Sequence, residues 1–363
     1  MITVIADDVT GAAEIAGIGM RFGLKVGMTT SLLSIPPCEL LVCATDTRSM
    51  PIEEAISHTV VLAERLKNLG CHELFKKTDS ALRGHIIAEL NALMQVMKVE
   101  KALLIPQNPS KGRVIQDGVY YINGIPLDKT LFANDPEHPA HSAIVKEILG
   151  RTIESISIPN AGSQEEIEQL TTCINNNTIP AGGADFFCSY LKHKGYKEQG
   201  FTCFGGLGNR SALFICGSTA NNSLTTSPYI QRNSVPTCPM DPAVFNGEDS
   251  RKWMDEVMRT YQASHSLVVT INQPSKGGKA FALRLKGIMA TLTSLLLAKR
   301  LPQELIIEGG ATAFAIFEEL GCRNFTITDE VAPGVVRMQP QEIPTLHITI
   351  KPGSYPWGEH LLQ

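Results

Sequence analysis

The chain has 363 residues, of which 43% are apolar and 19% are charged, so it is long enough for two domains with sizeable cores. Its net charge of −4 disfavours non-specific binding to nucleic acids or to membrane surfaces. The sequence contains no export signal, no run of 18 uncharged apolar residues and no C-x-x-C pair among its nine cysteines. We therefore expect a cytoplasmic protein with no membrane span, no zinc ribbon and buried cysteines such as Cys43 and Cys216.

Short apolar runs alternate with helical patterns through the first two hundred residues. The spacing of apolar residues predicts a helix that begins at Thr10, another over 51–70 and a third from Gly84. Asn123-Gly124 is a pair typical of a tight hairpin turn. The predicted strands of this half lie at 2–6, 25–30, 40–46, 72–80 and 101–106.

A polar, glycine-rich passage at 195–211 is the best candidate for a domain boundary, and the same alternation resumes after it. Strands that alternate with helices are typical of parallel sheets. We therefore predict two α/β domains with mostly parallel sheets, comprising residues 1–205 and 206–363. Ligands of such folds bind at the carboxyl ends of the strands, and we expect the active site in the cleft between the domains.

Two adjacent carboxylates, Asp7 and Asp8, stand where the first strand leads into a helix. One reading is that one acid is the helix N-cap and the other is solvated. The other is a carboxylate that acts as a general base or metal ligand at the active edge of the sheet. The D-x-D-x-[TV] pattern of one phosphatase class is excluded, because Ala6 occupies the position of its first aspartate.

Charged residues crowd the next strand–helix junction, in "KKTDSALRG" (76–84). A solvated cluster is the simple interpretation, but a guanidinium beside a lysine also suits an anionic, hydroxylated small molecule. Two proline-bounded loops follow, one with Arg113 and the other with Asp135 and His138. We interpret both loops as structural, although either could form a wall or lid of a site.

Small-residue turns between strands and helices recur in the second half. They include Gly217-Ser218 and 309–312. A later strand ends in Lys351, Gly353 and Ser354, a set that also suits an anion. Bare N–H groups at helix starts bind phosphate. No G-x-x-x-x-G-K-[ST] or G-x-G-x-x-G motif is present, which disfavours a Walker-A NTPase and an ordinary dinucleotide-dependent dehydrogenase.

These stretches together resemble the four-carbon acid sugar kinase family. The matching motifs follow in the family's order along nearly the whole chain: "ADDVTGA" (6–12), "KTDSALRG" (77–84), "PSKGR" (109–113), "DPEHP" (135–139), "AGGADF" (181–186), "GS" (217–218), "GGAT" (309–312), "APG" (332–334) and "KPG" (351–353). The resemblance implies a sugar-acid domain, a nucleotide domain and ATP-dependent phosphorylation of a threonate, an erythronate or a 3-oxo-tetronate.

The resemblance also implies roles for individual residues. Asp8 would be the general base or would orient the acceptor hydroxyl, and Asp7 would shape the site or cap the helix. The residues expected to bind the sugar acid are Asp7, Lys77, Asp79, Ser80, Arg83 and Arg113, with Arg83 on the substrate carboxylate. Those expected to bind ATP are Ser218, Gly309, Gly310, Ala311, Thr312 and Gly353.

Mg²⁺ is expected to bridge the phosphates of ATP, with protein ligands that remain unknown. The partners expected are thus the sugar acid and ATP, with a possible homodimer. Turns of the second half depart from the family pattern, for example at Ala311, so a sugar-acid sensor without turnover is the alternative function. A dehydrogenase or isomerase of the same acids is a third and weaker hypothesis.

Overall fold

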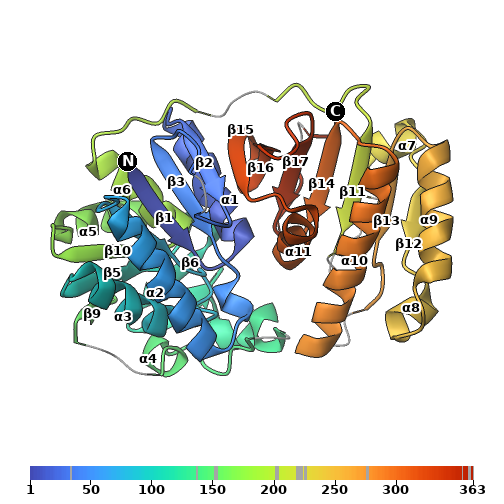
Figure 1. Ribbon diagram of the computed structural model, residues 1–363. Coiled ribbons are helices and arrows are strands. Elements are labelled where there is room, and N and C mark those ends of the chain that lie inside the picture. The colour runs from blue at the N-terminus through green and yellow to red at the C-terminus, as the bar shows by residue number, and fades with distance from the viewer. Residues whose placement is uncertain are drawn as a thin grey trace. The chain divides into compact units, whose positions relative to one another are not determined.

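The computed structural model describes residues 1–32, 35–135, 138–150, 154–200, 204–217, 224, 227–274, 278–353, 355–358 and 361–362. The chain divides into two compact units, Met1–Gly200 and Phe201–Gln363 (Figure 1). The predicted boundary lies between residues 205 and 206, in the same polar passage. Each unit is a sheet flanked by helices, as expected for two α/β domains.

The first unit contains a sheet of seven strands in the order β2-β3-β1-β4-β10-β5-β9 and a small antiparallel sheet in the order β6-β7-β8. Its strands are β1 (Ile2–Ala6), β2 (Val26–Thr29), β3 (Leu40–Ala44), β4 (Leu74–Lys77), β5 (Lys101–Ile105), β6 (Arg113–Gln116), β7 (Val119–Ile122), β8 (Ile125–Pro126), β9 (Ile156–Ser157) and β10 (Thr178–Gly182). Its helices are α1 (Val9–Arg21), α2 (Ile52–Asn68), α3 (Ile86–Met97), α4 (Val145–Ile148), α5 (Gln164–Leu170) and α6 (Ala184–His193).

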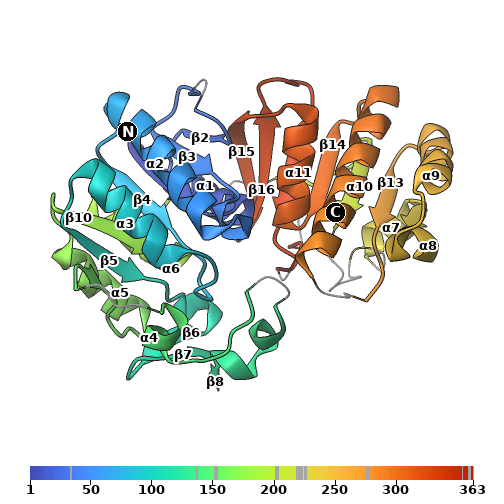
Figure 2. The same cartoon turned by 60° about the horizontal axis from the view of Figure 1, so that its bottom comes forward.

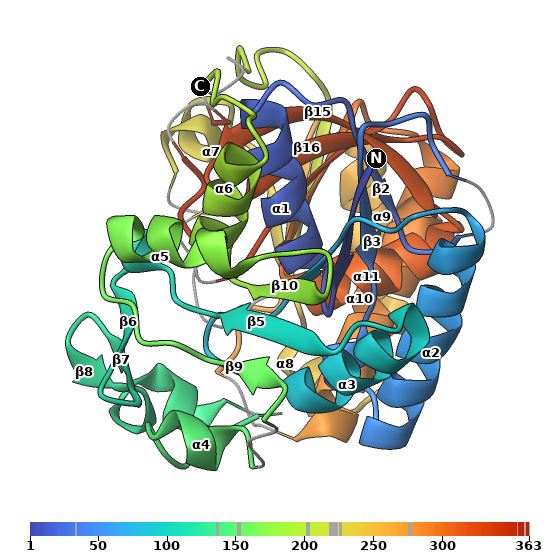
Figure 3. The ribbon, with the colours of Figure 1, turned by 90° about the vertical axis from the view of Figure 1, so that its left-hand side faces the viewer.

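Helices cover both faces of the large sheet of the first unit. α2 packs against α3 on one face, and α1 packs against α6 on the other (Figure 3). The strands are therefore buried on both sides and consist of nearly continuous apolar runs, such as Leu40–Ala44. The predicted hairpin is confirmed, since β7 and β8 pair across Asn123 and Gly124, which both have positive φ.

The second unit contains a mixed sheet in the order β12-β13-β11-β14-β17-β16-β15. Parallel pairs dominate, and only β15–β16 and β16–β17 are antiparallel among the described pairs. The strands are β11 (Ala212–Cys216), β12 (Thr237–Pro239), β13 (Leu267–Thr270), β14 (Glu304–Glu308), β15 (Asn324–Ala332), β16 (Val335–Pro340) and β17 (His347–Lys351). The helices are α7 (Pro228–Arg232), α8 (Pro242–Asn246), α9 (Arg251–Ala263), α10 (Lys279–Lys299) and α11 (Gly310–Leu320).

The long helix α10 packs beside α11 and also contacts α9 (Figure 2). It is the one helix, in the part of the chain that the structure describes, long and apolar enough to cross a membrane by length and composition. Core helices of soluble proteins pass the same test, so this is weak evidence for a span. Cys43 and Cys216 are buried as predicted, and the described cysteines are free thiols.

Candidate functional site

Three parallel strands of the first unit end side by side. Ala6, the last residue of β1, lies beside Ala44 of β3 and beside Lys77 of β4. Residues that follow these strands leave the sheet at the same edge. This edge therefore brings together the segments 7–8, 45–48 and 78–80.

Asp8 is the N-cap residue of α1. Its Oδ1 accepts the backbone N–H of Gly11 at 3.0 Å, and its Oδ2 accepts the hydroxyl of Thr10. The alternative in which Asp7 caps the helix is wrong, because the first helical hydrogen bond runs from Ala12 N to the carbonyl of Asp8. Asp7 is not solvated either, since it is only 3% exposed.

Arg48 joins the neighbouring carboxylates. Its Nε and Nη2 donate to the two oxygens of Asp7 at 2.9 and 3.0 Å. Nη2 also donates to Asp8 Oδ1 at 2.9 Å, and Nη1 lies 3.3 Å from Asp79 Oδ2. Arg48 was not among the predicted site residues. One signal could have indicated it. Arg48 comes just after the predicted strand at 40–46, and that strand is a neighbour of the first strand in the parallel sheet.

Asp79 and Arg83 form a second ion pair at this edge. Arg83 Nε and Nη2 donate to Asp79 Oδ2 at 3.1 and 2.6 Å, and Nη1 donates to Asp135 Oδ2 at 2.8 Å. A guanidinium has five N–H donors, so two remain open to a ligand as far as the described residues show. The loop of Asp135, which we interpreted as structural, thus belongs to the site.

The consecutive lysines Lys76 and Lys77 point to opposite faces of β4, as alternation along a strand requires. Lys77 Nζ lies 3.5 Å from Glu14 of α1 and donates to the carbonyl of Thr78 at 3.0 Å. Glu14 also pairs with Lys111. Neither Glu14 nor Lys111 was predicted, because only the tertiary fold brings α1 next to the loop at 109–113.

Ser80 and Arg113, which were both predicted to bind the sugar acid, are in contact. Arg113 Nη1 donates to the hydroxyl of Ser80, and the buried Tyr120 donates to the Ser80 carbonyl. The guanidinium carbons of Arg83 and Arg113 lie 5.2 and 5.5 Å from the centre of the Phe132 ring. Five of the six residues predicted to bind the acid are therefore connected to Asp8 through Arg48 and Phe132, and the sixth, Lys77, acts on Asp8 through its charge.

Electrostatics keeps the central carboxylates charged. Burial raises the pKa of Asp8, but Arg48 and Lys77 outweigh burial and lower the pKa of Asp8 below its usual value. For Asp79, burial again raises the pKa, while Arg83 and Arg48 lower it far more. Both groups are ionised at neutral pH and can only accept hydrogen bonds.

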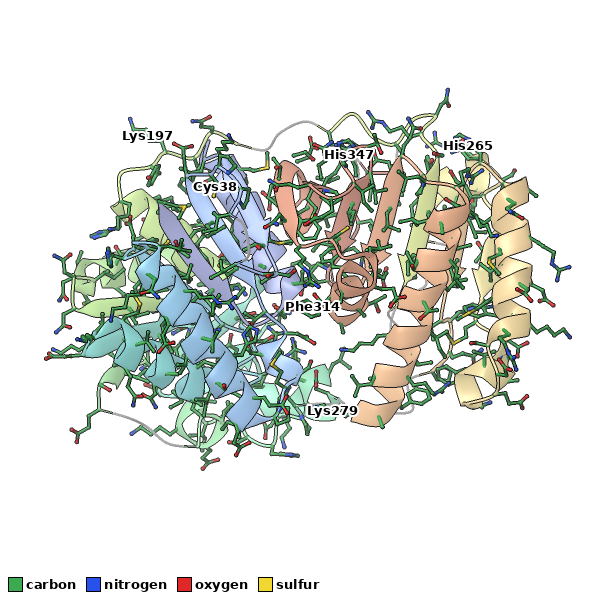
Figure 4. The ribbon with its side chains drawn as sticks, viewed as in Figure 1. Cys38, Lys197, His265, Lys279, Phe314 and His347 are labelled. Carbon is green, nitrogen blue, oxygen red and sulfur yellow. The ribbon has the colours of Figure 1, made fainter. Side chains whose placement is uncertain are left out.

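Strand ends of the second unit define another edge of the same kind. Cys216 of β11 lies beside Glu308 of β14, which lies beside Lys351 of β17. The segments that follow contain Gly217 and, among the residues predicted to bind ATP, 309–312 and Gly353. Figure 4 orients this unit, because His265 and His347 lie near the amino ends of the strands and Lys279 lies where α10 begins.

The start of α11 is suited to an anion. Its N-cap is Gly309, with φ of 104°, and no side chain caps its first turn. Gly217 packs against this turn, since a Cβ at Gly217 would stand only 2.7 Å from the Cβ of Thr312. Unoccupied N–H groups and the helix dipole favour a phosphate at such a terminus. The predicted residues Ser218 and Ser354 lie outside the described residues.

Lys351 does not offer its charge to an anion, in contrast to the expectation. Its side chain is fully buried, and Nζ donates to the carbonyls of Pro352 at 2.9 Å and Tyr355 at 2.7 Å. Nζ also lies 3.4 Å from the carboxylate of the equally buried Glu308. The ammonium is therefore used to shape the turn that carries Gly353.

No group of three or more His, Cys, Asp or Glu side chains that could hold a metal ion occurs within the described residues. At the acid site this has a physical reason. The guanidinium of Arg48 already occupies the position between Asp7, Asp8 and Asp79 where a cation would bind.

Comparison with known proteins agrees with a sugar-binding first unit and a nucleotide-binding second unit. Residues 2–178 match the family model of a sugar-binding N-terminal domain, and residues 213–355 match that of a nucleotide-binding C-terminal domain. A 3-oxo-tetronate kinase of Brucella melitensis is 24% identical over 92% of this chain and 88% of its own length. A D-threonate kinase of Salmonella typhimurium is 33% identical, over 40% of this chain and 35% of its own length.

A solved structure supports the fold. The crystal structure of a Haemophilus influenzae protein superposes with a TM-score of 0.73 at 19% identity, covering 98% of this chain and 97% of that one. A sugar-binding α/β domain followed by a nucleotide-binding α/β domain defines a two-domain carbohydrate kinase. The chain belongs to the four-carbon acid sugar kinase family, which confirms the resemblance in its motifs. The sensor alternative is not favoured, because these relatives are named kinases.

Proposed function

We propose that the protein transfers the γ-phosphoryl group of ATP to a terminal hydroxyl of a four-carbon sugar acid: a threonate, an erythronate or a 3-oxo-tetronate. The observation that carries this proposal is Asp8, an ionised carboxylate fixed at the active edge of a domain matched by a sugar-binding family model. Named relatives act on these same acids.

The acid is bound by cations around Asp8. Arg83, with a side chain 27% exposed and two open donors, binds the substrate carboxylate, and Arg113 also lies against the Phe132 ring. Lys77 orders a neighbouring oxygen. Asp7, Asp79 and Ser80 act mainly through these cations, since each is bonded to an arginine of the site.

The nucleotide is bound by the second unit. The first N–H groups of α11, at Gly310, Ala311 and Thr312, contact the phosphates, and Gly353 and Ser218, the latter named from its motif alone, also bind the nucleotide. Mg²⁺ would accompany ATP, and within the described residues no cluster of acidic, histidine or cysteine side chains is assigned to hold it. Its chemical contribution is to neutralise charge on the transferred group.

In the reaction the acceptor oxygen forms a bond to the γ-phosphorus while the bond from that phosphorus to the β–γ bridging oxygen breaks. The products are a phosphorylated acid and ADP, and the hydroxyl proton passes to Asp8. Phosphoryl transfer needs mostly positioning, so a carboxylate of lowered pKa can orient the hydroxyl and accept its proton late.

A coupled assay of ADP release with ATP and Mg²⁺, run on a panel of four-carbon sugar acids, tests this proposal. We expect turnover on one acid. Asp8→Asn should reduce kcat by at least about 100-fold, since proton transfer and orientation both fail, while binding of the acid persists. Acid binding without turnover on any acid by the unaltered protein would refute the kinase and restore the sensor.

Two further expectations belong to the same proposal. A possible homodimer is tested by sedimentation of the purified chain, where a monomer at all concentrations would contradict it. A cytoplasmic location, the natural place for ATP-dependent metabolism, is tested by fractionating cells that express the tagged protein.

A further inference from the structure

The turn that carries Arg48 is fastened to the end of β1. Thr45 N donates to the carbonyl of Ala6 at 3.0 Å, and Arg48 N donates to the carbonyl of Asp7 at 3.3 Å. Residues Thr47–Ser49 form a single 3₁₀ turn at this place. The backbone of Arg48 thus has a fixed position relative to the paired aspartates.

Two histidines also contact this turn. His138 Nε2 lies 2.8 Å from the carbonyl of Arg48, and His85 Nε2 lies 2.8 Å from the carbonyl of Met50. A carbonyl only accepts, so each histidine must carry its proton on Nε2. Their rings meet edge to face at 6.0 Å between centroids. The turn is therefore clamped between the sheet edge and two separate segments.

Gly84 provides the space for the Arg48 side chain. It has φ of 88°, and a Cβ there would stand 3.2 Å from Arg48 Cγ. A larger residue would both strain the backbone and push the arginine away from the aspartates. The glycine of the "LRG" motif thus serves Arg48 as well as the turn into α3.

We infer that Arg48 is a positioning residue for phosphoryl transfer: held by Asp7, it keeps Asp8 ionised and leaves Asp8 Oδ2 for the acceptor hydroxyl. Oδ1 of Asp8 already accepts from Gly11 and Arg48, whereas Oδ2 accepts from Thr10 alone among the described contacts, so Oδ2 keeps a lone pair for a substrate hydroxyl. This inference rests on the proposed function, because it concerns the same acceptor hydroxyl.

Charged residues from the neighbouring strand ends surround Asp8 and act on its pKa. Burial raises the pKa of Asp8, Arg48 lowers it most, and Lys77 lowers it less. Asp79 raises the pKa, and Asp7 is a like charge next in the chain. Without Arg48, Asp8 would stand buried beside two aspartates with Lys77 as its main counter-charge. Its pKa would then rise.

Arg48→Gln tests the inference through the pH profile of kcat/KM. Turnover requires ionised Asp8, so raising the pKa of Asp8 moves the acid limb to higher pH, by about 1–3 pH units for a lost arginine neighbour. Arg48→Lys keeps the positive charge but loses the paired N–H donors of the guanidinium. Its acid limb should therefore lie between those of the unaltered protein and of Arg48→Gln. Arg65→Gln removes an exposed arginine of α2 and should leave the limb unchanged.

A second readout does not need turnover. ¹³C-carboxyl NMR titration of the full chain, with the Asp8 signal assigned from Asp8→Asn, measures the pKa of Asp8 directly. A higher pKa in Arg48→Gln supports the inference even if no acid is phosphorylated. An unchanged pKa and an unmoved acid limb would overturn it, leaving a merely structural arginine. If Arg48→Gln does not fold, the same two measurements on Arg48→Lys decide the outcome.

Discussion

The ion pair between Lys76 and Glu89 offers a quantitative test of the first unit. Lys76 of β4 points away from the acid site onto α3, where its Nζ lies 2.5 Å from Glu89 Oε2. Both side chains are 1% exposed. In the described part of the chain, Lys76 Nζ and the two carboxylate oxygens of Glu89 have no further hydrogen-bond partner. Each charge therefore has the other as its direct partner, and His58 is near enough to feel both.

Lys76→Met removes one partner and leaves a buried carboxylate without a counter-charge. Breaking a buried pair in this way costs about 3–5 kcal/mol of unfolding free energy, a large part of the roughly 5–15 kcal/mol of a typical domain. The double variant Lys76→Met/Glu89→Leu replaces both charges with apolar groups of similar size. We expect its stability to lie within about 1–2 kcal/mol of the unaltered protein or above it.

Urea unfolding followed by far-UV circular dichroism measures these differences. Lys192→Met, which breaks an exposed pair with Glu168, is the matched control and should cost less than about 1 kcal/mol. The reasoning is refuted if the double variant loses the sum of the two single losses. Additive losses would mean that the two charges do not compensate each other.

Two predictions concern the nucleotide unit. Gly217→Ala forces its new Cβ against Thr312 in the first turn of α11, so stability should fall by about 1–3 kcal/mol and KM for ATP should rise, while KM for the acid stays constant. An unchanged KM for ATP would place the phosphates elsewhere. Lys351→Met strips Glu308 of its ammonium and releases the turn at Gly353; we expect a loss of about 3–5 kcal/mol in urea unfolding and a higher KM for ATP. Full stability in Lys351→Met would contradict the buried pair.

Several elements of this protein could be predicted because their cause is local. The Asn123-Gly124 turn needs only two residues that tolerate positive φ. The helix 51–70 was predicted from apolar spacing, acids in its first turn and Gly70 at its end, and the structure has it as α2. By contrast β10, formed late in the chain, inserts between β4 and β5, and no local pattern indicates that order.

The same division applies to the acid site. The motifs indicated Asp8, Arg83 and their neighbours, because adjacent charges at a strand–helix junction are easily recognised in the sequence. They could not indicate Arg48, whose partners Asp7 and Asp79 are brought to it by neighbouring parallel strands. Lys351 is the converse case. It stood out as a cation at a strand end, but its ammonium turns inward to carbonyl oxygens.

The sequence by itself determined the class of fold, the order of the two domains and the family, and it suggested most of the residues that we propose for the acid site, since each depends on short-range patterns and recognisable motifs. Only the tertiary structure decided which acid caps α1, which arginine pairs with the aspartates and which charged side chains are paired inside the protein. These depend on strand order and on the direction of side chains, and both are settled by packing between residues far apart in the chain.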